Sequence, residues 1–462
     1  MADFQIISPI DGSVYATRSY ADHSAIQKTL ERSQSLFSSW RSTPLEVRKE
    51  ICQKAVNYLM EHADELGQEI THMMGRPIRY TPYEIKGGFK ERAEHMISLS
   101  ESALQEIPAS SREGFRRFIR KEPLGTILVL SPWNYPYLTS VNAVIPALLA
   151  GNCVILKHAD QTALCAERYA EAFSAAGLSE GVFQFLHLTH GQTAELVQDS
   201  GIAHIAFTGS VEGGKAIQNA LNERFITCGL ELGGKDPAYV RADVELPFAV
   251  ENLVDGAYFN SGQSCCGIER IYVHDSIYDS FINLFAQTTI NYTLGDPRNP
   301  EVTLGPVVRD SNAKKIRLQI DKAIENGART LIDPSSFPNF LGSNYLPPQI
   351  LLDVDHSMEI MQEETFGPVV GIMSVRDDEE ALKLMNDSKY GLTASIWTRD
   401  INKALEIGDQ LETGTFFVNR CDYLDPTLAW TGVKDSGKGC TLSTLGFDQF
   451  VRPKSFHIRE AK

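Results

Sequence analysis

The chain has 462 residues, 43% of them hydrophobic and 22% charged, which predicts two or three globular domains with a substantial core. Lysine and arginine total 43 against 59 aspartate and glutamate residues, so the formal net charge is −16. Because nucleic acids and anionic membranes are bound by basic surfaces, this balance argues against both as the main partner.

The first residues contain no basic start followed by an apolar stretch, so we expect no secretory signal. The eight cysteines have no regular spacing, and neither they nor the eleven histidines form a metal-binding pattern. We therefore expect reduced thiols, a cytoplasmic location and no metal site.

The first 114 residues are mostly helical in pattern, and a charged, strand-like segment follows at 115–123. Residues 123–156 contain no charge, but Pro132, Pro136 and Pro146 interrupt them, so a buried strand, a loop, a helix and a second strand are a better interpretation than a membrane helix. Further along, apolar strands continue to alternate with helices. The expected strands are 126–131, 153–157, 182–188 and 202–208, with helices at 138–150, 162–177 and 191–199.

This alternation predicts a doubly wound, mainly parallel sheet with ligands at the carboxyl ends of its strands. A second α/β series begins after residue 231, with expected strands at 267–274, 369–375, 392–398 and 414–419 and helices at 276–292 and 311–328. The tail 447–459 again resembles an edge strand. Together with 115–123 it lies outside both sheets, and the two segments either pair with another subunit or form a surface hairpin.

Two segments follow the expected strands of the first sheet. In Ser-Pro-Trp-Asn-Tyr-Pro (131–136), the Asn134 carboxamide at a strand end can donate to an oxyanion, although a proline-rich turn explains an isolated Trp-Asn pair equally simply. In Phe-Thr-Gly-Ser-Val-Glu-Gly-Gly (207–214), Gly209 and Ser210 would present amides and a helix N-terminus to phosphate. The usual Gly-x-Gly-x-x-Gly spacing is absent there, so a plain strand-to-helix turn is the alternative.

Two further segments carry groups suited to covalent chemistry. Glu231 lies between two leucines, and desolvation there would raise its pKa toward that of a general base, unless it faces solvent at a strand end. Cys265 follows the expected helix end at Ser261 and Gly262, in a turn where a thiol can be reactive, although an arbitrary cysteine is more often inert. Together the four segments describe one reaction, in which a thiolate attacks a carbonyl, a nucleotide accepts hydride and a carboxylate activates water.

The sequence resembles the NAD(P)-dependent aldehyde dehydrogenase superfamily over nearly its whole length. The matching motifs are Pro-Trp-Asn-Tyr-Pro, Phe-Thr-Gly-Ser, Glu-Leu-Gly-Gly-Lys, Phe-Asn-x-Gly-Gln-x-Cys and Glu-Glu-Thr-Phe-Gly-Pro, in the family's order. The resemblance implies that Cys265 is the nucleophile, Asn134 the oxyanion donor and Glu231 the general base. It further implies a cofactor-binding set of Trp133, Lys157, Asp160, Gly209, Ser210, Gly214, Glu364 and Phe366.

The resemblance also implies an architecture and an assembly. A cofactor-binding domain would comprise residues 1–105 and 124–231, a catalytic domain 232–440, and a small β oligomerisation arm 106–123 and 441–462. Homodimers or homotetramers are expected. Where the family usually has Lys-Pro-x-Glu, this chain has Lys157 and then Asp160 three residues later. Because that carboxylate would repel a 2′-phosphate, NAD is the expected cofactor, with NADP left open.

By position, the aldehyde substrate would lie in a mixed, moderately polar pocket formed by Tyr135, Tyr137, Leu138, Asn142, Ser264, Cys266, Tyr423, Leu424 and Trp430. No arginine is assigned to this pocket, so an acidic semialdehyde is not expected, and Asp422 is expected on a solvated loop. Two rival functions stay open. A coenzyme-A-acylating dehydrogenase would not require Glu231, and a catalytically silent NAD-binding scaffold would not be expected to retain Cys265, Asn134 and Glu231.

Overall fold

A six-stranded sheet forms the first half of the fold in a computed structural model that describes residues 2–338 and 342–460. Neighbouring strands are parallel except at one edge, where β19 pairs antiparallel with β9. The strand order is β19 (Gly437–Lys438), β9 (Thr227–Glu231), β8 (Ile202–Thr208), β5 (Thr126–Ser131), β6 (Cys153–His158) and β7 (Phe183–Phe185).

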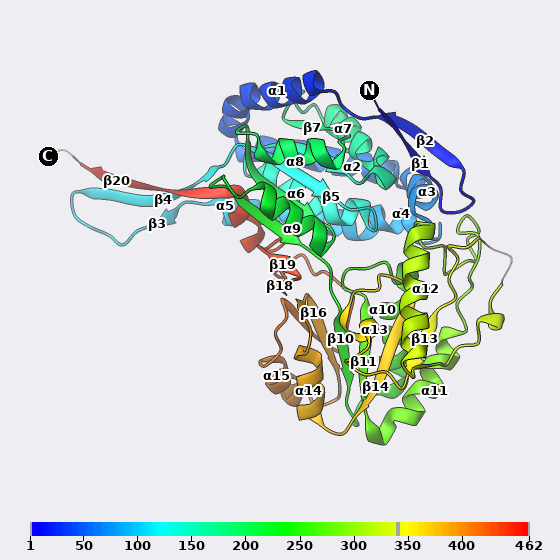
Figure 1. Cartoon of the computed structure of the whole chain (residues 1–462). Coiled ribbons are helices and arrows are strands. Elements are labelled where there is room, and N and C mark those ends of the chain that lie inside the picture. Colours follow the sequence, from blue (N-terminus) through cyan, green and yellow to red (C-terminus); the bar gives the residue numbers. More distant parts are fainter. Residues whose placement is uncertain (1, 339–341, 461–462) are drawn as a thin grey trace.

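Helices cover this sheet, as the alternating pattern predicts (Figure 1). Side chains at their first turns explain where several begin: Asp22 accepts from Ala25 N, and Ser210 from Gly213 N. A hairpin of β1 (Asp3–Ile7) and β2 (Val14–Ser19) precedes them. The helices are α1 (His23–Ser42), α2 (Leu45–Glu61), α3 (Ala63–Met74), α4 (Thr81–Tyr83), α5 (Lys90–Leu104), α6 (Pro136–Leu149), α7 (Leu164–Ala175), α8 (His190–Gln198) and α9 (Val211–Ala220), with a π-helical turn at Glu84–Phe89.

The uncharged stretch 123–156 forms β5, α6 and β6, all largely buried, and the apolar side chains of these three elements explain its composition. Among the helices of the described residues, none combines the length and the apolar character needed to cross a membrane.

A seven-stranded sheet forms the second half of the fold, again parallel except for its edge strand β12. Its order is β12 (Arg329–Thr330), β13 (Gln349–Leu352), β14 (Val369–Val375), β11 (Ile268–His274), β10 (Asp236–Val240), β16 (Thr393–Trp397) and β17 (Thr415–Val418). The accompanying helices are α10 (Leu246–Tyr258), α11 (Tyr278–Thr289), α12 (Asp310–Glu325), α13 (Glu359–Gln362), α14 (Asp378–Asn386) and α15 (Ile401–Gly408), and β15 (Tyr390–Gly391) pairs with β18 (Val433–Lys434).

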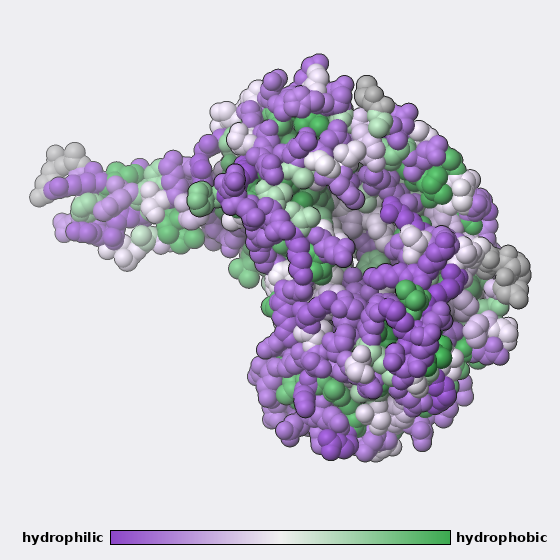
Figure 2. Space-filling model, viewed as in Figure 1, coloured by the Kyte–Doolittle hydropathy of each residue, from purple (hydrophilic) through white to green (hydrophobic). Residues whose placement is uncertain are grey.

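A three-stranded antiparallel arm projects from the first half of the molecule (Figure 1). Its strands are β20 (Val451–Arg459), β4 (Phe115–Pro123) and β3 (Ile107–Pro108), in that order. The two strand candidates outside the main sheets therefore pair with each other, in a register that runs from Val451 opposite Pro123 to Arg459 opposite Phe115. Figure 2 shows hydrophobic residues among the hydrophilic ones along this arm.

Most element boundaries agree with the sequence pattern to within a few residues, and the exceptions have local causes. The strand expected at 182–188 shortens to β7, which is an edge strand with β6 as its one neighbour in the sheet. The tail strand begins at Val451 because residues 445–450 form a 3₁₀ turn. Residues 437–438, which the sequence assigns to the catalytic domain, return to the first sheet as β19.

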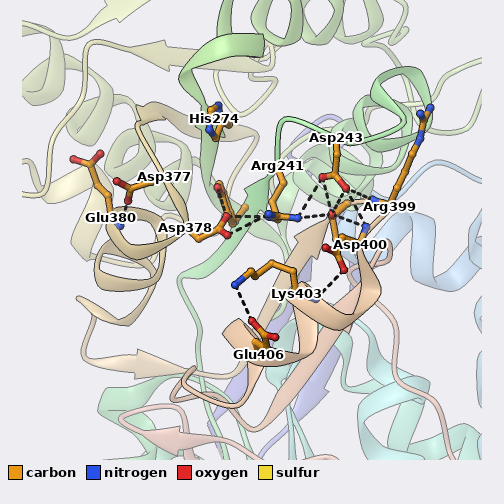
Figure 3. Close-up of polar contacts among 12 residues, drawn as sticks. Arg241, Asp243, His274, Asp377, Asp378, Glu380, Arg399, Asp400, Lys403 and Glu406 are labelled. Carbon is orange, nitrogen blue, oxygen red and sulfur yellow. Dashed lines mark hydrogen bonds and ion pairs between the residues drawn. The ribbon is translucent and has the colours of Figure 1, made fainter.

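At the carboxyl ends of the second sheet, charged side chains pair with one another (Figure 3). The Arg241 guanidinium, directly after β10, donates to the Asp378 carboxylate at 2.9 and 3.2 Å. Asp243 accepts from the Thr398 hydroxyl at 2.7 Å and from the Asp400 N–H at 3.0 Å. These contacts join the loops that follow β10 and β16 to the first turn of α14.

Candidate active site

The carboxyl ends of the first sheet and the amino ends of the second border one cavity of about 260 Å³. From the first sheet, Thr208 and Glu231 come from the ends of β8 and β9. From the second, Cys265 precedes β11 and Leu392 precedes β16. Residues far apart in the sequence are thus brought to one chamber.

Two of the three residues expected to be catalytic line this chamber, and the third is buried beside them. Cys265 and Glu231 line it, and Cys265 is partly exposed. Asn134 is buried beside the loop of Cys265, where its Nδ2 donates to the Gln263 carbonyl at 3.2 Å. A carboxamide nitrogen carries two N–H groups, so a second remains for an oxyanion.

The turn before Cys265 has an unusual backbone. Asn260, Ser261 and Gly262 have φ values of 53°, 56° and 69°, in the left-handed region that L-residues seldom adopt. Gly262 also packs so closely against the Gly367 carbonyl that a Cβ would collide with it. Such clustered strain is typical of functional loops, where the surrounding contacts hold it in place.

The Gln263 side chain supplies two of those contacts. Its Nε2 donates to the Asn260 carbonyl at 3.0 Å, and its Oε1 accepts from the Val308 N–H at 2.9 Å. The Gly-Gln pair of the motif thus sets the backbone from which Cys265 projects.

The neighbouring thiol has a different environment. Cys266 is buried, and its Sγ donates to Asp422 Oδ1 at 3.0 Å, while Ser264 Oγ donates to the same oxygen at 2.8 Å. A hydrogen bond with Cys265, together with burial, raises the pKa of the Cys266 thiol well above its usual value. Cys266 therefore stays protonated. The solvated loop expected for Asp422 is wrong, because this half-buried carboxylate lines the cavity.

Glu231 is held at the end of β9 by two hydroxyl groups. Thr441 Oγ1 donates to Oε1 at 2.5 Å, and Thr208 Oγ1 donates to Oε2 at 3.1 Å. Burial raises the pKa of the Glu231 carboxyl, and these two hydrogen bonds oppose that rise. A carboxylate of raised basicity that faces a cavity can take a proton from water.

A buried ion pair supports the Asn134 loop, and the sequence motifs contain no sign of it. Arg76 Nη2 contacts Glu84 Oε2 at 2.6 Å and also donates to the Asn134 carbonyl at 3.0 Å. Glu84 Oε1 accepts from the N–H groups of Tyr137 and Leu138 at 2.7 and 3.1 Å. The pair thereby caps α6 and ties it to the loop before it.

The segment 207–214 forms a glycine-lined cradle at the N-terminus of α9. A Cβ on Gly209 would lie 2.7 Å from the Phe207 ring, and one on Gly214 would lie 2.7 Å from the Leu232 side chain. Ser210 caps the helix by accepting from Gly213 N at 3.1 Å. A helix N-terminus presents unpaired N–H groups to an anion. Because glycine has no side chain, a cofactor phosphate can approach them here.

Two more of the residues expected to bind the cofactor contact each other. Phe366 has a φ of 54° and packs edge-to-face on Trp133, with ring centroids 5.6 Å apart. Glu364 Oε1 accepts from the Gly234 N–H at 3.1 Å. Burial raises the pKa of Glu364 to about 7. A carboxylate beside aromatic rings is suited to a ribose and a nicotinamide, so the residues present fit a dinucleotide cofactor.

At the end of β6, Lys157 Nζ lies 3.4 Å from Asp160 Oδ1. The Tyr20 hydroxyl donates to Asp160 Oδ2 at 2.7 Å. Tyr20 comes from the loop between β2 and α1, so a segment remote in sequence orients this carboxylate.

The cavity wall includes eight of the nine residues that the sequence places in the substrate pocket: Tyr135, Leu138, Asn142, Ser264, Cys266, Tyr423, Leu424 and Trp430. The ninth, Tyr137, is not on this wall, because it is fully buried and packs against Phe89 and Tyr169. The wall also includes three charged residues that sequence reasoning missed, Glu91, Arg92 and Asp255. The expectation that no arginine reaches the pocket is wrong. The missed residues lie on α5 and α10, where no motif marks them, and the tertiary packing of these helices brings them to the site.

Comparison with known proteins gives one consistent answer. The model of the aldehyde dehydrogenase family matches residues 2–456. The succinate semialdehyde dehydrogenase Sad of Escherichia coli (strain K12), named as NAD(P)+-dependent, is 34% identical over 450 residues, 96% of this chain and 95% of its own. An aldehyde dehydrogenase of Paenarthrobacter nicotinovorans is 33% identical over 452 residues, 97% of this chain and 98% of its own. The crystal structure of the Streptococcus pyogenes succinic semialdehyde dehydrogenase with NADP+ has a TM-score of 0.94 at 28% identity and covers 99% of this chain and 100% of its own.

Proposed function

Because the chain belongs to the aldehyde dehydrogenase family and is an NAD(P)-dependent oxidoreductase acting on aldehydes, we propose that Cys265, Asn134 and Glu231 carry out the oxidation in this cavity. The observation that carries the proposal is the meeting of Cys265 and Glu231, from the two halves of the fold, on one chamber bordered by the cofactor cradle.

The first half of the reaction is acylation. The Cys265 thiolate attacks the aldehyde carbon, and a C–S bond forms as the carbonyl oxygen becomes an oxyanion. Asn134 Nδ2 and the Cys265 N–H receive that oxyanion. NAD(P), when bound, accepts the hydride from the same carbon. A thioester on Cys265 remains.

The second half is hydrolysis. Glu231 takes a proton from water, and the resulting hydroxide attacks the thioester carbon. The C–S bond breaks, the carboxylic acid leaves and the Cys265 thiolate is restored. A coenzyme-A-acylating enzyme would pass the acyl group to an external thiol, and the position of Glu231 on the cavity favours water as the acceptor.

The preferred cofactor is NAD. Lys157 would reach the adenine ribose, while Asp160, oriented by Tyr20, places negative charge where a 2′-phosphate would lie.

The enzyme is proposed to be a cytoplasmic homodimer or homotetramer. In support, all eight cysteines are free thiols. Within the part of the chain that the structure describes, β20 pairs with β4 on one side and has no strand on the other. Phe118 and Phe456 stack across the arm at 4.6 Å, and the free edge beside them can pair with another copy. Light scattering would measure the mass of the assembly.

The test is NADH formation at 340 nm with NAD and then NADP, across aliphatic, aromatic, amino- and carboxy-substituted aldehydes, with and without coenzyme A. Succinate semialdehyde belongs in the panel because the Escherichia coli relative is named for it. Turnover without coenzyme A, lost in Cys265→Ala while NAD binding persists, is the expected result. Turnover that requires coenzyme A would favour the acylating alternative, and turnover retained in Cys265→Ala would remove Cys265 from its role.

A further inference from the structure

Arg92 is a buried positive charge on the cavity wall. Glu231, Glu84 and Asp422 attract it through space, but none of these carboxylates contacts it directly. Arg92 on α5 is 7% exposed, and its Nη1 donates to the Leu138 carbonyl at 2.6 Å. Among residues 2–338 and 342–460, no carboxylate lies within 4.0 Å of its guanidinium nitrogens. Arg76, which is equally buried, differs because it contacts Glu84 directly.

A buried arginine that contacts no carboxylate is suited to bind an anionic ligand. Burial without a paired charge costs free energy, and burial lowers the pKa of the Arg92 guanidinium. One hydrogen bond to a carbonyl uses one of five N–H groups, and the planar fork of the others suits two oxygens of one ligand. Since Arg92 borders the chamber, that ligand enters with the substrate.

We propose that Arg92 binds a carboxylate at the far end of the substrate and makes the enzyme selective for short aldehydes that carry one. This inference rests on the proposed function, because it concerns the same cavity. Arg92 is therefore a specificity-determining residue.

Four carboxylates line the cavity, Glu91, Glu231, Asp255 and Asp422, and each of them is exposed or already accepts hydrogen bonds from other groups. Glu91 and Asp255 are exposed at the cavity, and Glu91 accepts from the Tyr423 hydroxyl at 2.8 Å. Asp422 already accepts from Ser264 and Cys266. Glu231 is held by the Thr208 and Thr441 hydroxyls, whereas Arg92 has one contact with a carbonyl, so N–H groups of Arg92 remain for a ligand.

The same four carboxylates distinguish between anions. A phosphate ester carries about −1.5 to −2 charges near neutral pH, and a single guanidinium beside Glu91, Glu231, Asp255 and Asp422 does not neutralise it. A carboxylate carries one charge, which Arg92 balances. The site therefore favours a carboxylated over a phosphorylated aldehyde.

The experiment compares succinate semialdehyde with its methyl ester, methyl 4-oxobutanoate, which keeps the aldehyde and the chain but removes the charge. 4-Aminobutanal tests a cationic substrate, and erythrose 4-phosphate tests a dianionic one. In the wild type, kcat/KM is expected to favour succinate semialdehyde over each of the other three.

Arg92→Gln should lower kcat/KM for succinate semialdehyde by about 100-fold, mainly through KM, and change that for the ester by less than about threefold. Arg92→Lys keeps the charge and should retain part of the preference; it also serves if Arg92→Gln does not fold. Lys86→Gln is the matched control, because it removes an exposed charge on the same stretch of chain, outside the cavity. It should change neither substrate's kcat/KM.

The inference is overturned if Arg92→Gln lowers kcat/KM for both substrates equally, or if the wild type prefers 4-aminobutanal or the phosphate. The two proposals fail in different ways. If only the role of Arg92 is wrong, the ester is still oxidised with NAD. If the proposed function is wrong, no aldehyde is oxidised through Cys265.

Discussion

At the carboxyl ends of the first sheet, the Glu231 and Thr208 side chains border the cavity of the candidate active site, whereas at the carboxyl ends of the second sheet Arg241 and Asp378 face each other. The second edge also has a hollow, but its charged side chains are already paired (Figure 3). The position of a site thus depends on which charged groups the fold leaves without an oppositely charged group in contact.

The second sheet contributes to the site from its other edge. Cys265 and Glu364 precede β11 and β14, so they lie at the amino ends of these strands. Parallel sheets generally bind ligands beyond their carboxyl ends, and the first sheet follows that rule. The second sheet departs from it because its carboxyl edge is closed by ion pairs and its amino edge faces the first sheet.

The largest effect is expected at the carboxyl edge of the first sheet, in Glu231→Gln. Without a carboxylate to take a proton from water, deacylation should slow by about 10³-fold, while a burst of NADH persists. Stopped-flow absorbance at 340 nm separates the two phases. Because burial raises the pKa of Glu231, wild-type turnover should fall as the pH drops through that raised value, and this acid limb should disappear in the variant. An unchanged steady state would remove Glu231 from the mechanism.

Asn134→Ala should slow acylation by roughly 10²–10³-fold, because the oxyanion would keep only the Cys265 N–H as donor. The burst rate measures this step. Asn134→Asp is a matched variant that keeps the shape but removes the N–H donors, and it should be no faster. An unaltered burst in both would show that the backbone N–H suffices.

At the cofactor end of the same edge, Asp160→Ser should raise kcat/KM for NADP roughly tenfold relative to NAD, because the charge that repels a 2′-phosphate is gone. Tyr20→Phe should shift the same ratio by about threefold, since Asp160 keeps its charge but loses the hydroxyl that orients it. Initial rates with both cofactors measure the shift. No change in either variant would place the cofactor preference elsewhere.

The smallest effect on catalysis is expected at the carboxyl edge of the second sheet. Arg241→Met should lower the free energy of unfolding by about 1–3 kcal/mol, because it leaves the Asp378 carboxylate without its partner. Its kcat/KM should stay within about twofold of the wild type. Urea unfolding and steady-state rates together test this, and a tenfold loss of activity in a folded variant would mean that this edge also has a function.

The local sequence predicts most of the secondary structure because the apolar runs of β5, β6 and β11 and the helices between them have distinct periods. It also proposes groups for the chemistry. Taken alone, Cys265, Asn134 and Glu231 each have an ordinary structural explanation, and their co-occurrence and the family resemblance assign the proposed roles. The predicted ends of β7 and β20 are less accurate, since the end of a strand depends on its neighbouring strands.

The sequence by itself thus determined the fold class and the family resemblance, and it proposed the reacting residues, because these inferences depend on periodicity and on contiguous motifs. Only the tertiary structure decided which charges face the cavity. Arg92, Asp422 and Arg76 come from segments without motifs, and their surroundings arise where elements distant in sequence pack together. A charge pattern along the chain does not reveal which side chain will be buried without a contacting opposite charge. The burial of Arg92 in this way is what we propose directs the choice of substrate.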